Sequence, residues 1–222
     1  MTVALMSFAL FDRHDEFIVR HGRLPHWYQP GVTYFVTFRT ADSIPRALQR
    51  SWHGRRSEWL KLHGFDPTTG VWRNRLRQDP ALEREFYKLF VPQFMAYLDR
   101  GYGNYVLRNR ELAHVTAEAL RHFDGDRYYL GDFVIMPNHV HLLVCLIGDT
   151  QIERQCRSWK RRTAFTINRT LRRHGRFWQS ESFDHLVRSP EQFDYLRHYI
   201  ADNPRRARLP RGNYLLSLHE RR

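Results

Sequence analysis

Cysteine is almost absent from this sequence, and so are segments that would place the chain in a membrane. Cys145 and Cys156 fit neither a disulfide framework nor a zinc-ligand spacing, which indicates a reduced, intracellular protein. No run of apolar residues approaches the length of a membrane span. The first residues also lack the positive region of a signal peptide. We therefore expect a cytoplasmic location.

Several signatures of catalysis are missing as well. Acidic residues form no clustered pair, which argues against a nuclease that holds two metal ions with carboxylates. There is no glycine-rich phosphate loop and no motif of a Ser or Cys nucleophile. Internal repeats and low-complexity tracts are absent too, so 222 residues suit one domain or one domain with a large insertion.

Acidic residues are also scarce relative to basic ones. Lys and Arg number 36 against 23 Asp and Glu, which gives a net charge of +13 and predicts a polyanionic partner such as nucleic acid. The charge is concentrated in residues 154–176, where no Asp or Glu occurs and aromatic residues are interleaved. A solvated helix face is the alternative, but such faces normally mix charges of both signs. Arginine with nearby aromatic rings instead favours single-stranded DNA.

We predict that DNA binding involves residues of this segment, together with basic residues near the first strand and near the C-terminus. They are Arg39, Arg154, Arg157, Lys160, Arg161, Arg162, Arg169, Arg172, Arg173, Trp178, Arg205 and Arg206.

The hydrophobic periodicity predicts an alternation of strands and helices after an irregular N-terminal segment at 1–30. Strands are expected at 32–39, 127–135, 139–146 and 182–188, and helices at 109–123, 151–174 and from residue 189 to about residue 203. Residues 46–100 look like a helical insertion broken by turn residues, and 211–222 like a basic C-terminal tail. Without the insertion the order is β-α-β-β-α-β. This predicts an α+β fold, a ferredoxin-like antiparallel sheet with helices on one face, in a domain covering residues 31–210.

The last predicted helix has clear boundary signals. Ser189 is suited to the N-cap, Pro190 to the first helical position and Gln192 to the third residue of a capping box. Pro204 disfavours a helical conformation in the residue before it, so we expect the helix to end near Asn203.

The segment His139-Val140-His141 is the sharpest chemical feature. In a strand, residues i and i+2 point to the same face, so both imidazoles project side by side and can share a metal ion. A pair of hydrogen-bonded core histidines is an equally good explanation of this pattern taken alone.

Tyr199 and Asn203 stand four residues apart in the last helix, which stacks them on one helix face. The amide oxygen of Asn203 is a hard ligand that suits Mg²⁺ or Mn²⁺ beside two imidazoles, with the phenol next to the metal. The spacing alone is better explained by a surface aromatic residue and a helix terminator.

Several segments together resemble the single-tyrosine transposases of the HUH type, named for two His around a hydrophobic residue. The resemblance lies in residues 136–144 (MPNHVHLLV), with 33–39, 177–179, 183–185 and the segment Tyr199-Ile200-x-x-Asn203-Pro204 in the same order. It covers roughly residues 24–210, and the most similar branch is the REP-associated tyrosine transposases.

The resemblance implies a nuclease core in a bacterial, nucleoid-associated protein that cleaves and transfers single-stranded DNA bearing hairpins. It implies Tyr199 as the nucleophile, a covalent 5′-phosphotyrosine intermediate, and a Mg²⁺ or Mn²⁺ site formed by His139, His141 and Asn203. Compact relatives carry Gln where this sequence has Asn203, which is one methylene shorter. A monomer and a homodimer both fit the sequence.

Three other functions remain open from the sequence. The chain could be a nucleic-acid binder without catalysis, because the same sheet topology serves RNA-recognition modules. It could be a domesticated transposase kept for binding or regulation. A zinc-dependent hydrolase would need a third His, Cys or carboxylate ligand, which the sequence does not place.

Overall fold

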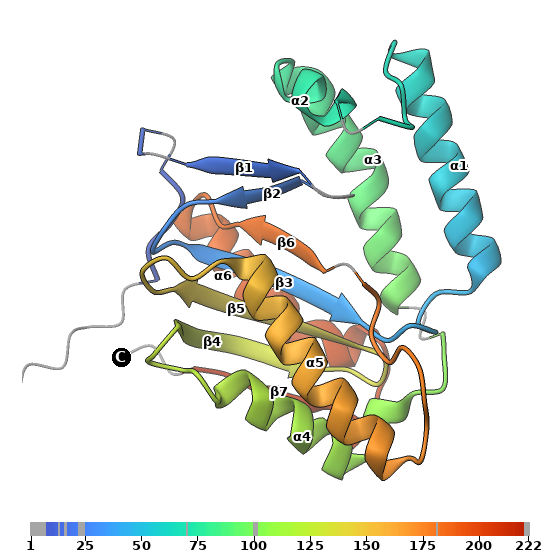
Figure 1. The fold of residues 1–222 in the computed structure, drawn as a ribbon, viewed down its shortest axis with the longest axis vertical. Coiled ribbons are helices and arrows are strands. Elements are labelled where there is room, and N and C mark those ends of the chain that lie inside the picture. Colours follow the sequence, from blue (N-terminus) through green and yellow to red (C-terminus); the bar gives the residue numbers. More distant parts are fainter. Residues whose placement is uncertain are drawn as a thin grey trace, which may run out of the picture.

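The fold is seen in a computed structural model, which describes residues 8–219 apart from 13, 16, 22–24, 70, 100–101 and 181. A five-stranded antiparallel sheet with the strand order β6-β3-β5-β4-β7 forms its centre (Figure 1). Its strands are β3 (Thr33–Arg39), β4 (Tyr128–Ile135), β5 (His139–Leu146), β6 (Phe183–Leu186) and β7 (Leu215–Ser217).

Four of these strands and two helices reproduce the predicted β-α-β-β-α-β order. Helix α4 (Arg110–Arg121) connects β3 to β4, and α5 (Ile152–Thr170) connects β5 to β6. The neighbours β6-β3-β5-β4 are those of a ferredoxin-like sheet, so the fold prediction is confirmed.

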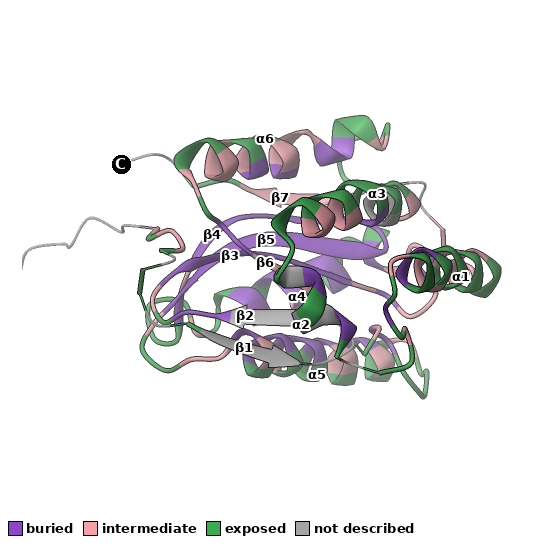
Figure 2. Ribbon diagram, turned by 90° about the horizontal axis from the view of Figure 1, so that it is seen from above, coloured by how far each residue is buried: buried purple, intermediate pink, exposed green. Residues whose placement is uncertain are grey.

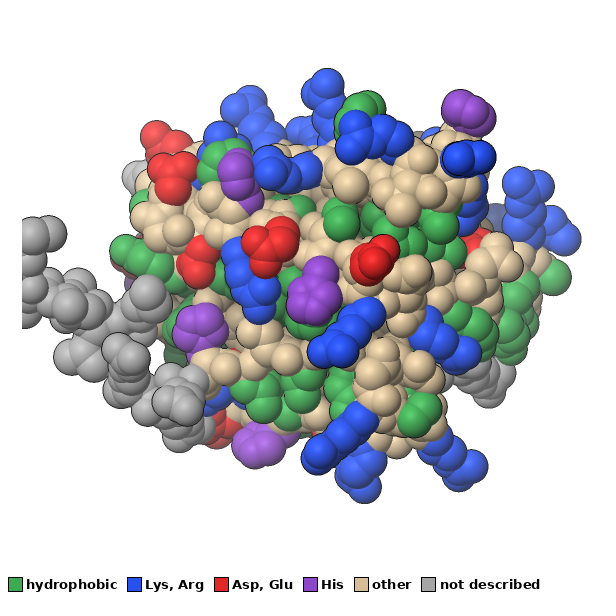
Figure 3. Space-filling view, turned by 90° about the horizontal axis from the view of Figure 1, so that it is seen from below, with side chains coloured by type: hydrophobic (Ala, Val, Ile, Leu, Met, Phe, Trp, Pro, Cys, Tyr) green, Lys and Arg blue, Asp and Glu red, His purple; other side chains and the backbone are tan. Residues whose placement is uncertain are grey.

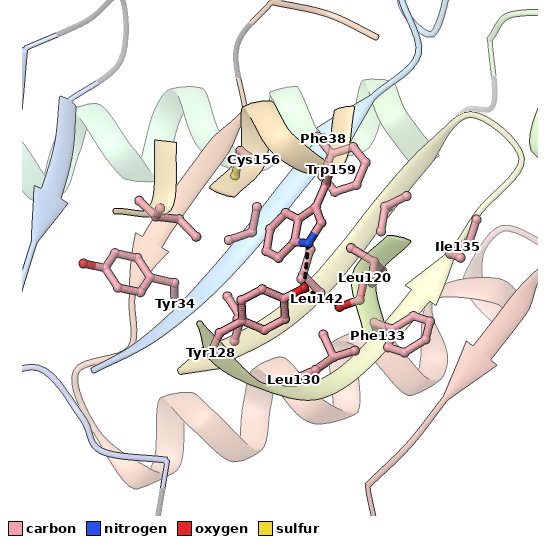
Figure 4. Packing of buried hydrophobic residues seen from close by; sticks show 14 of the residues in the cluster. Tyr34, Phe38, Leu120, Tyr128, Leu130, Phe133, Ile135, Leu142, Cys156 and Trp159 are labelled. Carbon is pink, nitrogen blue, oxygen red and sulfur yellow. Dashed lines mark hydrogen bonds between the residues drawn. The ribbon is translucent and has the colours of Figure 1, made fainter. Parts of the chain in front are cut away.

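Helices cover both faces of the sheet once α6 (Pro190–Arg206) is included. Figure 2 shows α4 and α5 on one side of the strands and α6 on the other. The α4/α5 face carries the main core, in which Trp159 of α5 donates a 2.9 Å hydrogen bond to the hydroxyl of Tyr128 (Figure 4). The α6 face carries a second apolar cluster that includes Phe35, Leu143 and Ile200. Alternate residues of β5 therefore enter different layers.

The predicted insertion is a helical unit with its own apolar cluster. It consists of α1 (Arg46–Leu62), α2 (Trp72–Arg77) and α3 (Pro80–Asp99), followed by the short 3-10 helix η1 (Val106–Arg108). Trp59, Phe65 and Trp72 belong to this cluster. In Figure 1 the unit projects beyond the β6 side of the sheet.

The two ends of the insertion meet at Asp42. Its side chain accepts a 2.9 Å hydrogen bond from the backbone of Asn104. Gly103 has φ +104°, and a Cβ at this residue would lie only 3.1 Å from Asp42, so a glycine is required there. The insertion thus leaves the sheet and returns to it at one place.

Two predictions about the chain ends are wrong. The segment 1–30 is not irregular throughout, because β1 (Ile18–His21) and β2 (Pro25–Tyr28) pair as an antiparallel hairpin. Their residues are largely β-branched and aromatic, and Pro25 stands at the first position of its strand, where a missing N–H is tolerated. Within 211–222, β7 pairs with β4 and extends the sheet by one strand. Residues 1–7 and 220–222 lie outside the described part of the chain.

The predicted start of α6 is confirmed and its predicted end is wrong. The hydroxyl of Ser189 accepts a hydrogen bond from the backbone of Gln192, as expected for the N-cap. The helix, however, continues through Pro204 to Arg206. It ends where Arg208 adopts φ +52° and the backbone of Leu209 donates to the carbonyl of Pro204. This closing turn satisfies the last carbonyls without a glycine.

Candidate active site

Two histidines of β5 form the centre of the site. His139 and His141 point to the α6 face and are almost fully buried, with ring centroids 4.6 Å apart. The pairing of β5 with β3 places Arg39 opposite His139 and Thr37 opposite His141. Strand periodicity and register together therefore produce a buried imidazole pair flanked by one hydroxyl and one guanidinium.

Hydrogen bonds at Nδ1 fix the orientation of both imidazole rings. The Nδ2 group of Asn138 donates to the carbonyl of Tyr102, which leaves Oδ1 of Asn138 to accept from Nδ1 of His139 at 2.7 Å. Nδ1 of His141 lies 2.7 Å from the hydroxyl of Thr37. With the proton of His139 on Nδ1, its Nε2 carries the lone pair that a metal ligand needs. The hydroxyl of Thr37 can accept from Nδ1 of His141 in the same way, which would leave Nε2 of His141 as a lone-pair donor too.

Four polar side-chain atoms of the site are buried, and Asn203 lies close to His139. Nε2 of His139, Nε2 of His141 and both polar side-chain atoms of Asn203 are buried without a hydrogen-bond partner among the described residues. Asn203 nevertheless lies close enough to raise the pKa of His139. Polar atoms buried in this way are costly, and they are explained by a ligand that they bind. Two imidazoles and one amide oxygen fit a divalent cation.

Burial keeps the imidazoles neutral, which is the form that binds metal. The pKa of His139 is lowered to about 3, mainly by removal from water and in part by the positive charge of Arg39. Burial, and then the neighbouring His139, also hold the pKa of His141 well below its usual value. Neither ring must lose a proton before it can accept a cation at neutral pH.

Tyr199 reaches the same place from α6. Its ring lies edge-on to that of His141, with centroids 5.2 Å apart, and it also contacts Phe35 at 6.0 Å. The guanidinium carbon of Arg206 lies 5.3 Å from the centre of the Tyr199 ring. The structure thus brings Tyr199 together with His139, His141 and Asn203, the four residues for which catalytic or metal-binding roles were predicted.

A further pair of residues in the site carried no predicted role. Asn138 and Thr37 orient the two imidazoles. Asn138 is adjacent to the histidines in sequence and could have been suspected from that position. Thr37 became recognisable only through the register of β3 against β5. Among the described residues, no third His, Cys, Asp or Glu joins the pair, as a zinc hydrolase would require.

The predicted DNA-binding residues fall into three groups. Arg39 and Arg206 lie at the site itself, whereas the exposed Arg205 pairs with Asp202 at 3.0 Å. The exposed arginines of α5 and the following turn lie across the sheet from Tyr199; they are Arg154, Arg157, Arg161, Arg162, Arg169, Arg172 and Arg173. Figure 3 shows one face of the molecule on which many Lys and Arg side chains are interspersed with a few acidic side chains and His. The arginines of α5, which were predicted to bind DNA, therefore do not lie beside the tyrosine.

The surface positions expected for Lys160 and Trp178 are also wrong. The ammonium of Lys160 is buried and donates to the carbonyls of Gln179 and Ser180 at 3.2 and 2.7 Å. Trp178 is 3% exposed, packs edge-on against Phe38 and donates to the hydroxyl of Thr163 at 2.7 Å. Lys160 is buried because α5 turns this side toward the sheet, and Trp178 is buried where its backbone pairs with Thr40 next to β3.

Because Trp178 is buried, we predict that it contributes to the stability of the fold. Trp178→Ala is expected to lower the free energy of unfolding by about 3–5 kcal/mol, the usual cost of emptying a site of this size in a core. Phe165→Ala is the matched control, because Phe165 of α5 is 69% exposed and its loss is expected to change stability by less than about 0.5 kcal/mol. Urea unfolding measures both, and similar values for the two variants would refute the assignment.

Comparisons with known proteins give one family match and one similar solved structure. Residues 104–203 match the family model described as "Transposase IS200 like", which spans α4 to α6 but neither β3 nor the insertion. No curated protein matches the chain. One similar solved structure is described as the "REP associates tyrosine transposase bound to a REP hairpin"; it shares 15% identity and a TM-score of 0.43, over 81% of this chain and 70% of that one. No helix among the described residues is long and apolar enough to cross a membrane.

Proposed function

Because residues 104–203 match the family model described as "Transposase IS200 like", we propose that this chain cleaves and rejoins single-stranded DNA through a covalent bond to Tyr199. One observation carries the proposal: the phenol ring of Tyr199 lies against the imidazole of His141. A surface aromatic residue would not be expected to pack on a buried His pair whose Nε2 atoms have no hydrogen-bond partner among the described residues.

The reaction is a transesterification. The hydroxyl of Tyr199 loses its proton and attacks the scissile phosphorus; the new O–P bond forms as the bond to the 3′ oxygen breaks, and that oxygen leaves as a 3′-OH. The 5′-phosphotyrosine conserves the phosphodiester bond energy, so a later 3′-OH can attack it and release Tyr199. No external energy source is needed for rejoining.

His139, His141 and Asn203 are the residues that would hold Mg²⁺ or Mn²⁺. When bound, the cation supplies a positive charge that polarises a phosphate oxygen. Asn203 is shorter than the Gln of compact relatives, so α6 must lie closer to β5 here if the amide oxygen is to serve. Asn138 and Thr37 hold the two rings in place, while Arg39 and Arg206 add positive charge for the phosphate.

The DNA substrate is proposed to be a single strand with a hairpin, as in the REP-associated tyrosine transposases that the sequence resembles. The arginines of α5 lie on the opposite face of the sheet from Tyr199. They suit a part of the DNA far from the cut, such as the hairpin stem, through phosphate contacts. All residues of the proposed site come from one chain, so a monomer can carry the reaction.

The test uses a pool of single strands with one fixed hairpin and randomised flanks. With Mg²⁺ or Mn²⁺, a label on the 3′ end is expected to migrate with the protein on a denaturing gel, and a label on the 5′ end to appear in a shorter strand with a free 3′-OH. Removal of the cation with EDTA is expected to abolish both products.

Peptide mapping of the adduct should place the DNA on the peptide that contains Tyr199. Release of both fragments without a covalent adduct would contradict the tyrosine mechanism. Binding of the pool without any cleavage would instead favour a domesticated or non-catalytic DNA-binding protein.

A further inference from the structure

A pocket opens beside Tyr199, and the helical insertion forms one of its walls. It has a volume of about 490 Å³ and lies between α3, β6 and α6. Its lining includes Tyr87 and Ala96 of α3, Phe183 and His185 of β6, and Tyr195 and Tyr199 of α6. The size falls in the range of pockets that enclose small organic groups.

The pocket is lined by aromatic residues together with basic residues. Tyr195 is 64% exposed, so its ring is accessible from solvent. The arginines 84, 188 and 206 also line the pocket, and Glu83 is its acidic member. Flat rings combined with guanidinium groups are the surroundings in which a nucleobase stacks while its phosphates are neutralised.

His185 adds a polar group of fixed orientation. Oε1 of Gln192 accepts from the backbone of Arg188, so its Nε2 must donate to Nε2 of His185 at 2.8 Å. Burial lowers the pKa of His185 to about 4, and the positive charge of Arg188 adds to this effect, so the ring is neutral with its proton on Nδ1. No described residue accepts from this N–H, which suits the edge of a base.

From these features we infer that the pocket holds one nucleobase next to the scissile phosphate, turned out of the strand and stacked between the insertion and α6. The inference rests on the proposed function, because the reaction at Tyr199 brings a phosphate to the mouth of the pocket. A base within one nucleotide of that phosphate reaches the aromatic lining. The inserted helix α3 thereby gives the enzyme a preference for the base at one position of its cut site.

The first test uses a substitution that reduces the volume of the pocket and leaves the reacting residues unchanged. Ala96→Trp on α3 adds a large ring at an exposed position of the lining, whereas Leu89→Trp adds the same ring on α3 outside the pocket. Strands captured covalently from the randomised pool are sequenced for each protein. We expect wild type and Leu89→Trp to share a base preference near the cut, and Ala96→Trp to weaken it at one position by about 5- to 150-fold, the range of base-stacking effects.

The second test needs neither metal nor cleavage. Single strands containing 5-bromodeoxyuridine are irradiated with the protein in EDTA, and the cross-linked residues are mapped. Cross-links are expected on Tyr87 or Tyr195 and should disappear in Ala96→Trp, while those on the exposed Phe165 of α5 should remain.

The outcomes separate the two proposals. If wild type forms no covalent adduct, the proposed function is wrong, and the cross-links still test whether a base occupies the pocket. An adduct with unchanged base preference in Ala96→Trp, or cross-links only outside the pocket, overturns this inference and leaves the proposed function standing.

Discussion

Tyr199→Phe is expected to abolish the covalent adduct while the protein still binds the hairpin pool. The substitution removes one oxygen and keeps the ring that contacts His141 and Phe35, so the packing of α6 is retained. Loss of the nucleophile of a covalent enzyme typically lowers the rate on the order of 10⁴-fold or more. Adduct formation on denaturing gels measures this effect, and filter binding measures the retained affinity.

Tyr129→Phe provides the matched control for this variant. Tyr129 lies on β4 opposite Cys145, at the end of the sheet away from the histidines, and is partly buried like Tyr199. Its loss of a hydroxyl should leave the adduct unchanged. If Tyr199→Phe forms as much adduct as Tyr129→Phe, another residue carries the DNA and the proposed mechanism is wrong.

His141→Ala is expected to remove the affinity for divalent cations and, with it, cleavage. Residues that only orient metal ligands commonly change affinity by about 10- to 100-fold, so loss of a ligand should exceed that range. Calorimetric titration with Mn²⁺ gives the affinity directly. In wild type the cation should also raise the stability, by about 2.7 kcal/mol at 100 times its dissociation constant, and this gain should vanish in the variant.

Thr37→Val tests the same site with a graded effect. It removes the hydroxyl that contacts Nδ1 of His141 and keeps the shape of the side chain, so Mn²⁺ affinity should fall by about 10- to 100-fold. His114→Ala on the exposed surface of α4 is the control and should bind Mn²⁺ as wild type does. Equal affinities in His141→Ala and His114→Ala would exclude His141 as a ligand.

Local sequence signals predicted the parts of the site that depend on short-range geometry. The period of two in a strand placed His139 and His141 on one face, and the capping residues 189–192 fixed the start of α6. The four-residue spacing placed Tyr199 and Asn203 on one face of α6, and packing turned that face toward the sheet. These relations hold in the folded protein because they depend only on local backbone geometry.

The predictions that were wrong depended on long-range packing, which local sequence patterns do not report. A cluster of arginines and aromatics does not tell which side of α5 meets the sheet, and Lys160 lies on that side; Trp178, which follows α5, is buried as well. Pro204 was expected to end α6, but the helix continues two residues beyond it, and Arg208 and Leu209 close the turn there. The contact between Thr37 and His141 joins residues 104 positions apart, and no local pattern reports it.

The single attachment point of the insertion at Asp42 and Asn104 has a consequence for how such enzymes diversify. A unit that enters and leaves through one narrow stem can be replaced by another without moving the imidazoles or α6, provided that Tyr102 stays to hold Asn138. Under the proposed function, chemistry and target choice reside in parts of the chain that can change independently. Exchange of the insertion could then create new cutting preferences at an unchanged reaction centre.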